Sequence, residues 1–193
     1  MFSGGPDDHG VMFYAQDDDL IGQATEYLLG VMRDNGVGVT LATPGHRAAI
    51  EARLEQAGIS LTTARARGTY VALDAEEVVS RVMINGFADP AGFWRAISPV
   101  IKNATGQRRK VAVFGEMVAL LWARDLTGAA VDLEALWDEM ASQYPFSMLC
   151  ALPADVLGTS EHADDLIGVI TAHAEQRTEW ALVDDAKTRS PES

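Results

Sequence analysis

Short uninterrupted apolar runs alternate along this chain with longer segments in which apolar residues recur every three or four positions. A short continuous run is typical of a fully buried strand, and the wider spacing is typical of an amphipathic helix. The runs predict strands over residues 9–15, 37–42, 69–73, 111–114 and 146–152, with a further weak strand in the segment 61–67. Because few polar residues interrupt the stronger runs, we expect both sides of the strands to be covered.

Helices are predicted between these strands. They run from Gln16 to Asn35, over 46–57, from Asp74 to Met83, over 89–105, over 117–123, from Asp132 to Tyr144, and over 161–180. Aspartates at 17–19, 74, 89 and 132 are the expected N-caps, and Glu77 would complete a capping box with Asp74. Pro99 lies within the pattern of 89–105, so a kink or a helix in two pieces is expected there. Residues 85–88 are expected to form a loop.

This alternation of strands and helices predicts a three-layer α/β domain, in which a mostly parallel sheet carries helices on both faces. Right-handed connections are expected between the strands. We expect a single domain over residues 9–181, preceded by a disordered leader over 1–8 and followed by a frayed tail over 182–193.

The charge and composition of the chain argue against several classes of function. Lysine and arginine number 15 against 28 acidic residues, which gives a net charge of −13. Because phosphate contacts need a basic patch, this balance argues against direct binding of nucleic acid. The single cysteine suits a reducing compartment, and no apolar run approaches the roughly 18 residues of a membrane span. The expected location is the cytoplasm, away from membranes.

The stretch KVAVFGEMVALLWARD carries the most informative carboxylate. Glu116 follows the strand 111–114 after a single glycine, and ligands of open α/β sheets bind at the carboxyl ends of strands. Tyr14 ends the first strand, and Trp122 and Phe114 would supply apolar walls. This pattern predicts a small-molecule cleft with a few polar anchors. The alternative, equally open at this point, is that Tyr14 and Trp122 are core residues and that Glu116 starts a helix.

The motifs of common catalytic sites are missing from the sequence. The first strand is followed by Gln16–Asp19, an acidic loop where nucleotide hydrolases have glycines and a lysine. There is no G-x-S-x-G, and the histidines lie on separate predicted elements. Folding could gather His9, Glu116 and His173 around a metal, but their spacing gives this no support. Cys150, in a predicted buried strand, is expected to act as a small hydrophobe. We therefore expect neither an enzyme nor a bound cofactor or metal.

Three segments stand out in order along the chain: HGVMFYAQDDDL, FGEMVALLWARD and LEALWDEMASQYPFSMLCALP. Together with the late His173, they resemble the MEDS domain, the methanogen/methylotroph, DcmR sensory domain. The resemblance implies a RecA/KaiC-like fold without the phosphate-binding loop and a role in sensing small organic, possibly hydrocarbon-derived, compounds. The residues that it marks for ligand binding are His9, Tyr14, Glu116, Trp122 and His173.

The same resemblance implies a signalling output. No recognition-helix segment is visible before residue 9, so we expect the output to pass through a signalling protein partner or self-association. Two alternatives stay open: a ligand-free interaction scaffold in a kinase or anti-sigma-type pathway, and a degenerate nucleotide-binding hydrolase that uses Glu116 as a base. We also expect His9 and Glu116 to share one cleft at the carboxyl edge of the sheet.

Overall fold

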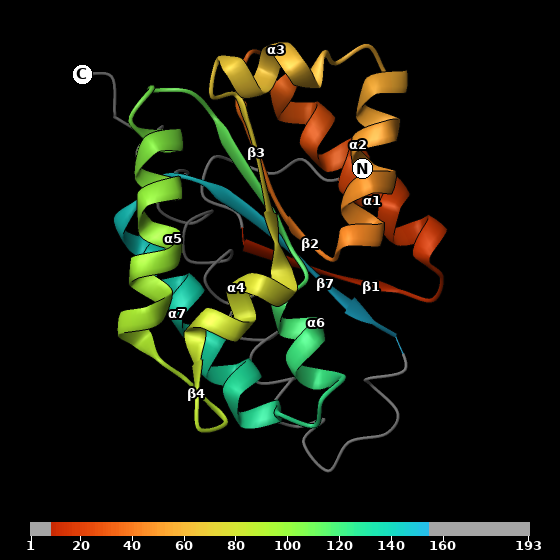
Figure 1. Ribbon diagram of the computed structural model, residues 1–193. Coiled ribbons are helices and arrows are strands. Elements are labelled where there is room, and N and C mark those ends of the chain that lie inside the picture. Colours follow the sequence, from red (N-terminus) through yellow and green to blue (C-terminus); the bar gives the residue numbers. More distant parts are fainter. Residues whose placement is uncertain (1–8, 155–193) are drawn as a thin grey trace, which may run out of the picture.

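A five-stranded parallel sheet runs through the centre of the molecule (Figure 1). The computed structural model describes residues 9–154. The strands lie in the order β1-β7-β6-β2-β3, and each neighbouring pair is parallel. Their bounds are β1 His9–Tyr14, β2 Val37–Ala42, β3 Tyr70–Asp74, β6 Val111–Gly115 and β7 Ser147–Pro153. The mostly parallel sheet predicted from the apolar runs is thus confirmed.

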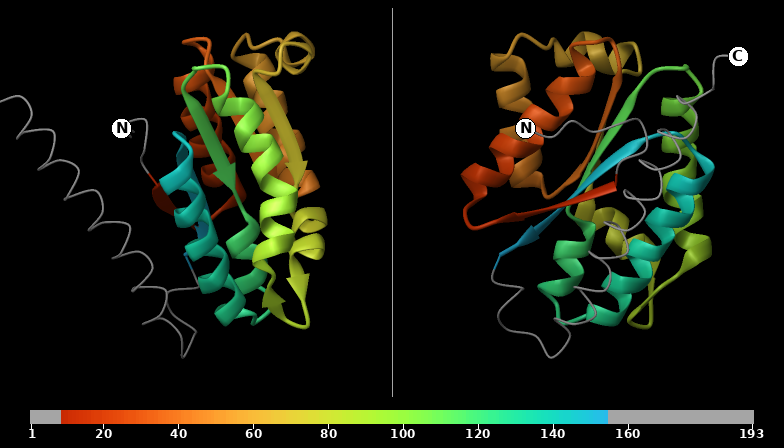
Figure 2. Two further views of the ribbon diagram at one scale, coloured as in Figure 1. Left: turned by 90° about the vertical axis from the view of Figure 1, so that its left-hand side faces the viewer. Right: turned by 180° about the vertical axis from the view of Figure 1, so that it is seen from behind.

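Helices cover the sheet on both faces, so the three-layer α/β class is confirmed (Figure 2). The first face, called here the α1–α3 face, carries α1 Asp17–Met32, α2 Pro44–Gln56 and α3 Leu61–Ala66. The opposite face, called the α4–α7 face, carries α4 Ala75–Val82, α5 Pro90–Thr105, α6 Met117–Trp122 and α7 Thr127–Gln143. A short hairpin, β4 Met83–Ile84 and β5 Phe87–Ala88, links α4 to α5.

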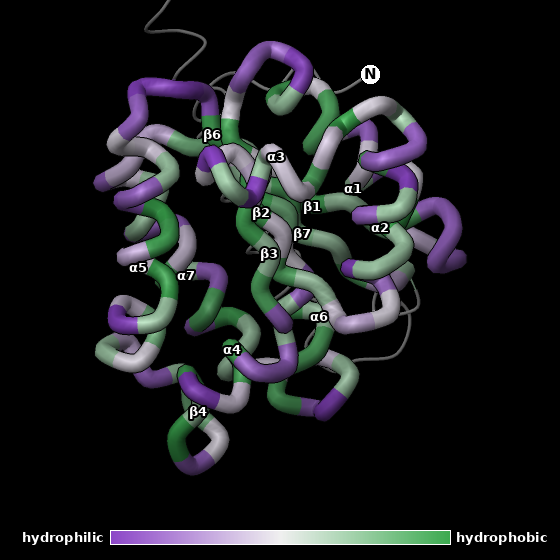
Figure 3. The backbone as a smooth tube through the Cα atoms, turned by 45° about the horizontal axis from the view of Figure 1, so that its top comes forward, coloured by the Kyte–Doolittle hydropathy of each residue, from purple (hydrophilic) through white to green (hydrophobic). Residues whose placement is uncertain are grey.

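Two apolar cores result, one under each helical layer. Successive side chains of a strand point to opposite faces, so alternate residues enter different cores. In β7, Met148 and Cys150 pack in the core of the α4–α7 face, and Leu149 and Ala151 pack in the other core. Figure 3 shows hydrophobic backbone concentrated in the strands and hydrophilic segments toward the outer helices and loops. Within residues 9–154, no helix has the length and apolar character needed to cross a membrane.

The core of the α4–α7 face is organised around Trp137 of α7. Its ring meets Phe93 of α5 edge to face, with centroids 5.1 Å apart, and meets Phe146 at 6.3 Å. All three side chains are almost fully buried. Edge-to-face pairs add roughly 0.5–1.5 kcal/mol to the stabilisation from burial, so this cluster holds α7 in register on the sheet.

The chain reverses its winding direction between two central strands. From β2 it continues into α2 on the α1–α3 face, whereas from the adjacent β6 it continues into α6 on the opposite face. Leu41 and Gly115 are paired in register, so both strands end at the same level. Such a switch point leaves room for a ligand outside the carboxyl ends of the strands.

Some helix caps agree with the sequence patterns and others do not. Asp74 accepts hydrogen bonds from the N–H groups of Glu76 and Glu77, and Asp89 caps α5 by accepting from Gly92 N. The Glu77 carboxylate pairs with Arg81 rather than completing the capping box. The aspartates at 17–19 form the first turn of α1 after an N-cap at Gln16. Asp132 lies inside α7, which begins at Thr127.

Further local predictions differ from the structure in whole or in part. Residues Leu61–Ala66 form α3 and not a weak strand, because Ser60 accepts a hydrogen bond from Thr63 N while Leu61 and Ala64 bury one helical face. The helix α5 runs in one piece through Pro99, so the alternative of a helix in two pieces is wrong; Ile97 and Ile101 anchor it in the core on both sides. The expected loop over 85–88 includes β5 of the hairpin. The predicted helix over 161–180 lies outside the described residues.

Candidate functional site

Glu116 lies at the switch point, directly after β6. Its backbone N–H donates to the carbonyl of Leu41 at 3.0 Å, which extends the β2–β6 pairing by one residue. The residue is only 2% exposed. It occupies the N-cap position of α6, yet its side chain makes no capping hydrogen bond there. The carboxylate is therefore directed away from its own helix.

The Glu116 carboxylate instead binds the first residues of α2. Thr43 N–H donates to Oε2 at 2.9 Å, and His46 Nδ1 lies 2.5 Å from Oε1. Thr43 is the N-cap of α2 and Pro44 begins it, so His46 falls in its first turn, facing the end of β6. A charge-assisted hydrogen bond of this kind is shorter and stronger than a neutral one.

His46 connects this buried carboxylate to the surface. Its Nε2 lies 3.5 Å from Oδ2 of Asp17 at the start of α1, and Asp17 is largely exposed. Burial by itself lowers the pKa of His46, but the hydrogen bond and charge of Glu116, reinforced by Asp17, raise the pKa above its ordinary value of 6.5. We call Glu116, His46, Asp17 and Thr43 the strand-end cluster. Because the pKa of His46 is raised, its imidazole holds a proton more tightly than a free histidine does.

The chemistry of the strand-end cluster suits recognition. His46 can donate from Nε2, and Asp17 can accept, so a small molecule with a hydroxyl or amino group could bind both. Asp17, Asp18 and Asp19 follow β1 directly in the first turn of α1 and place negative charge beside the strand ends. An approaching phosphate would be repelled by these carboxylates.

Two other residues predicted for this cleft pack against the apolar cores. Tyr14 ends β1, the edge strand, and packs partly buried against the core of the α1–α3 face. Trp122 is buried in the core of the α4–α7 face, as the core alternative predicted. His173 lies outside the described residues.

His9 belongs to a different part of the molecule. Its Nδ1 lies 2.8 Å from Oδ1 of Asp138 in α7, on the α4–α7 face, whereas Glu116 binds α2 on the α1–α3 face. The prediction that His9 and Glu116 share one cleft is therefore wrong. The two residues also lie at different levels of the sheet, since His9 pairs with Met148 of β7 whereas Gly115, just before Glu116, pairs with Cys150.

Sequence patterns did not identify His46 and Asp17 as partners of Glu116. Each lies in the first turn of a helix that follows a strand, and this was their only sequence signal. Helix starts after parallel strands gather at one edge of the sheet, but which of them meet depends on strand order. The adjacency of β2 and β6 placed His46 against Glu116.

These features define the chain as a doubly wound α/β domain with a hydrogen-bonded cluster at its switch point. A family model described as MEDS, the MEthanogen/methylotroph, DcmR Sensory domain, matches residues 8–173. The chain therefore belongs to the MEDS family, and the resemblance noted in the sequence is confirmed. Membership indicates a sensory or regulatory role. No curated protein matches the chain.

Proposed function

We propose that this chain is a sensory domain that binds a small, neutral or cationic organic molecule at the carboxyl ends of β2 and β6. The observation that carries the proposal is the strand-end cluster, because it places a donor and an acceptor together at the switch point of a MEDS domain. His46 and Asp17 contact the ligand, and Glu116 positions His46. No catalytic turnover is part of this function.

The ligand is selected by charge. Glu116 and the three aspartates of the first turn of α1 set a negative potential at the strand ends, and the whole chain carries −13. Desolvating an anion beside carboxylates costs several kcal/mol, whereas a hydroxyl or ammonium group gains hydrogen bonds there. Small alcohols and amines therefore fit better than phosphates or carboxylates.

Transmission to a signalling partner uses the two helices that the ligand would connect. Asp17 and His46 lie in the first turns of α1 and α2, which pack against each other over the sheet. If α1 and α2 adopt two arrangements, a ligand that binds Asp17 and His46 more tightly in one of them increases the population of that arrangement. A protein partner or a second copy of the chain then recognises the favoured arrangement.

A ligand-free interaction scaffold is the second candidate function. The β4–β5 hairpin supports it, because Ile84 and Phe87 are 53% and 68% exposed and are the exposed large hydrophobic residues of the described chain. Exposed apolar side chains on a protruding turn suit contact with another protein. Under this alternative, the strand-end cluster would only brace α1 and α2.

Ligand binding is tested by native mass spectrometry and calorimetry against small alcohols, amines, halocarbons and nucleotides. We expect one class of neutral or cationic compound to bind with one molecule per chain. His46→Ala should weaken that binding about 10- to 100-fold, corresponding to roughly 1.5–3 kcal/mol for hydrogen bonds to a charged group. Glu55→Gln, an exposed change on the same helix α2, is the control and should leave affinity unchanged.

Tight binding of nucleotides, or affinity indifferent to His46→Ala, would contradict the ligand proposal. Failure of every compound to bind would favour the scaffold.

We expect no hydrolysis of ATP or GTP. The segment after β1 leads from Gln16 directly into three aspartates, and both oxygens of Glu116 are already engaged by α2, which leaves the carboxylate poorly placed to orient a water. Phosphate release measured with purified protein should equal that of a protein-free blank. Steady turnover that disappears in Glu116→Gln would restore the hydrolase alternative.

A further inference from the structure

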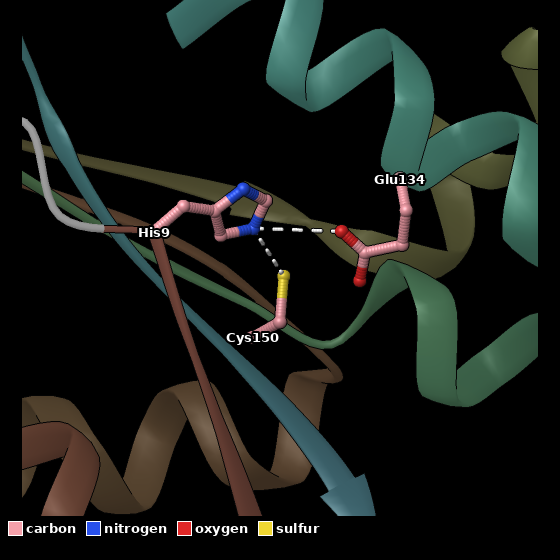
Figure 4. A group of neighbouring side chains, drawn as sticks. All are labelled: His9, Glu134 and Cys150. Atoms are coloured by element: carbon pink, nitrogen blue, oxygen red, sulfur yellow. Dashed lines mark hydrogen bonds and ion pairs between the residues drawn. The ribbon is translucent and has the colours of Figure 1, made fainter. Parts of the chain in front are cut away.

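A second polar cluster is buried on the α4–α7 face, the face of the sheet opposite α2. It brings together His9 from β1, Glu134 from α7 and Cys150 from β7, whose side chains point toward one another (Figure 4). They are 8%, 2% and 1% exposed, respectively. One donor atom from each residue lies within 4.8 Å of the others. Imidazole nitrogen, carboxylate oxygen and cysteine sulfur are the ligand types of zinc sites.

The two distances from His9 agree with the edges of a metal-centred tetrahedron. His9 Nε2 lies 3.5 Å from Cys150 Sγ and 3.4 Å from Glu134 Oε2. Bonds of about 2.0–2.3 Å from zinc to nitrogen, oxygen and sulfur place tetrahedral ligands roughly 3.4–3.6 Å apart. The three side chains therefore need little rearrangement to bind one ion.

Asp138 orients the histidine for this role. Its Oδ1 lies 2.8 Å from His9 Nδ1, one helical turn after Glu134 on α7. A carboxylate that accepts from Nδ1–H leaves the lone pair of Nε2 directed at Cys150 and Glu134. This carboxylate–histidine–metal arrangement recurs in zinc proteins and raises the basicity of the ligand.

We propose that His9, Glu134 and Cys150 bind a Zn²⁺ ion, with Asp138 as the residue that positions His9. Binding releases the Cys150 proton to solvent, so that thiolate, carboxylate and neutral imidazole coordinate the cation. A fourth position is left for water or another small donor. The site is independent of the ligand proposed at the strand-end cluster, since the two lie on opposite faces of the sheet.

The same residues could be mistaken for a catalytic cysteine, histidine and aspartate. However, Cys150 is fully enclosed, and burial raises the pKa of its thiol well above the ordinary value, with Glu134 and Asp138 raising it further. A nucleophilic cysteine needs the opposite environment, exposed and electropositive. A divalent cation supplies the positive charge that offsets Glu134 and stabilises the thiolate, which favours a metal site over a nucleophile.

The test uses Co²⁺ as a spectroscopic substitute for Zn²⁺ in the full chain, after removal of metal with a chelator. We expect one Co²⁺ per chain, intense tetrahedral d–d bands and a sulfur-to-cobalt charge-transfer band that stoichiometric Zn²⁺ abolishes. Because the chain has a single cysteine, this band assigns Cys150 without any substitution. Absence of the band in the wild-type protein would overturn the proposal, whatever the behaviour of the variants.

Substitutions then assign the remaining residues. Asp138→Asn should keep the band but weaken Co²⁺ binding about 10- to 100-fold, the usual effect of losing such a partner. Glu134→Gln should also weaken binding and shift the d–d bands. Glu139→Gln removes the same charge from an exposed position of α7 and should change neither affinity nor spectrum. Equal affinities in Glu134→Gln and Glu139→Gln, or a band that persists in Cys150→Ser, would refute the assigned ligands.

Discussion

Replacement of Trp137 by alanine should lower the free energy of unfolding by about 3–5 kcal/mol, the range for deleting a buried aromatic ring. Trp137 is 1% exposed and packs edge to face against Phe93 and Phe146, so its removal leaves a cavity between α5, α7 and the sheet. Urea denaturation followed by far-ultraviolet circular dichroism measures the loss. The same substitution should also weaken metal binding, because Trp137 holds the turn of α7 that carries Glu134 and Asp138.

Trp94→Ala is the matched control for this prediction. Trp94 also contacts Phe93, at 6.3 Å between ring centroids, but it is only partly buried. Its removal exposes less new apolar surface and should cost less than half as much as the loss of Trp137. Equal losses for the two tryptophans would show that the cluster around Trp137 does not organise this core.

Glu116→Gln should lower the free energy of unfolding by about 1.5–3 kcal/mol near pH 6, the scale of a hydrogen bond to a charged group. The substitution removes the charge that faces protonated His46 and weakens the acceptor for Thr43 N–H. Urea denaturation of both proteins gives the difference. Glu55→Gln, which removes an exposed charge from α2, should change stability by no more than about 0.5 kcal/mol.

The effect of Glu116→Gln should depend on pH in a defined direction. The pKa of His46 is raised in the folded state above its ordinary value of 6.5, so protonated His46 stabilises the fold fully below that value. This stabilisation is lost as the pH rises through the raised pKa. The difference between wild type and Glu116→Gln should therefore be largest near pH 6 and decrease toward more alkaline pH. A difference that is constant across this range would contradict the coupling of His46 to Glu116.

Local patterns were sufficient for the fold class because they depend on neighbours in the chain. Continuous apolar runs such as Val111–Gly115 indicate the central strands, since a strand covered on both faces is apolar at most positions. Asp74 and Asp89 were recognised as caps because a carboxylate next to the first turn reaches the free N–H groups within three residues. The sequence pattern does not mark Ser60 as a cap, and it therefore predicts a strand where α3 forms.

Which residues meet in the strand-end cluster and in the cluster around His9 depends on strand order, and local sequence patterns do not encode strand order. The sequence determined that Glu116 follows a buried strand, that His9 begins one and that Cys150 lies within another. Only the tertiary structure placed β7 beside β1, which brings Cys150 to His9, and β2 beside β6, which brings His46 to Glu116. The face of each residue then followed from the alternation along its strand, which separated His9 from Glu116. Local propensity acts over a few residues, whereas strand neighbours are selected by the burial of whole faces of the sheet. The partners of His9 and Glu116 were therefore decided by tertiary packing.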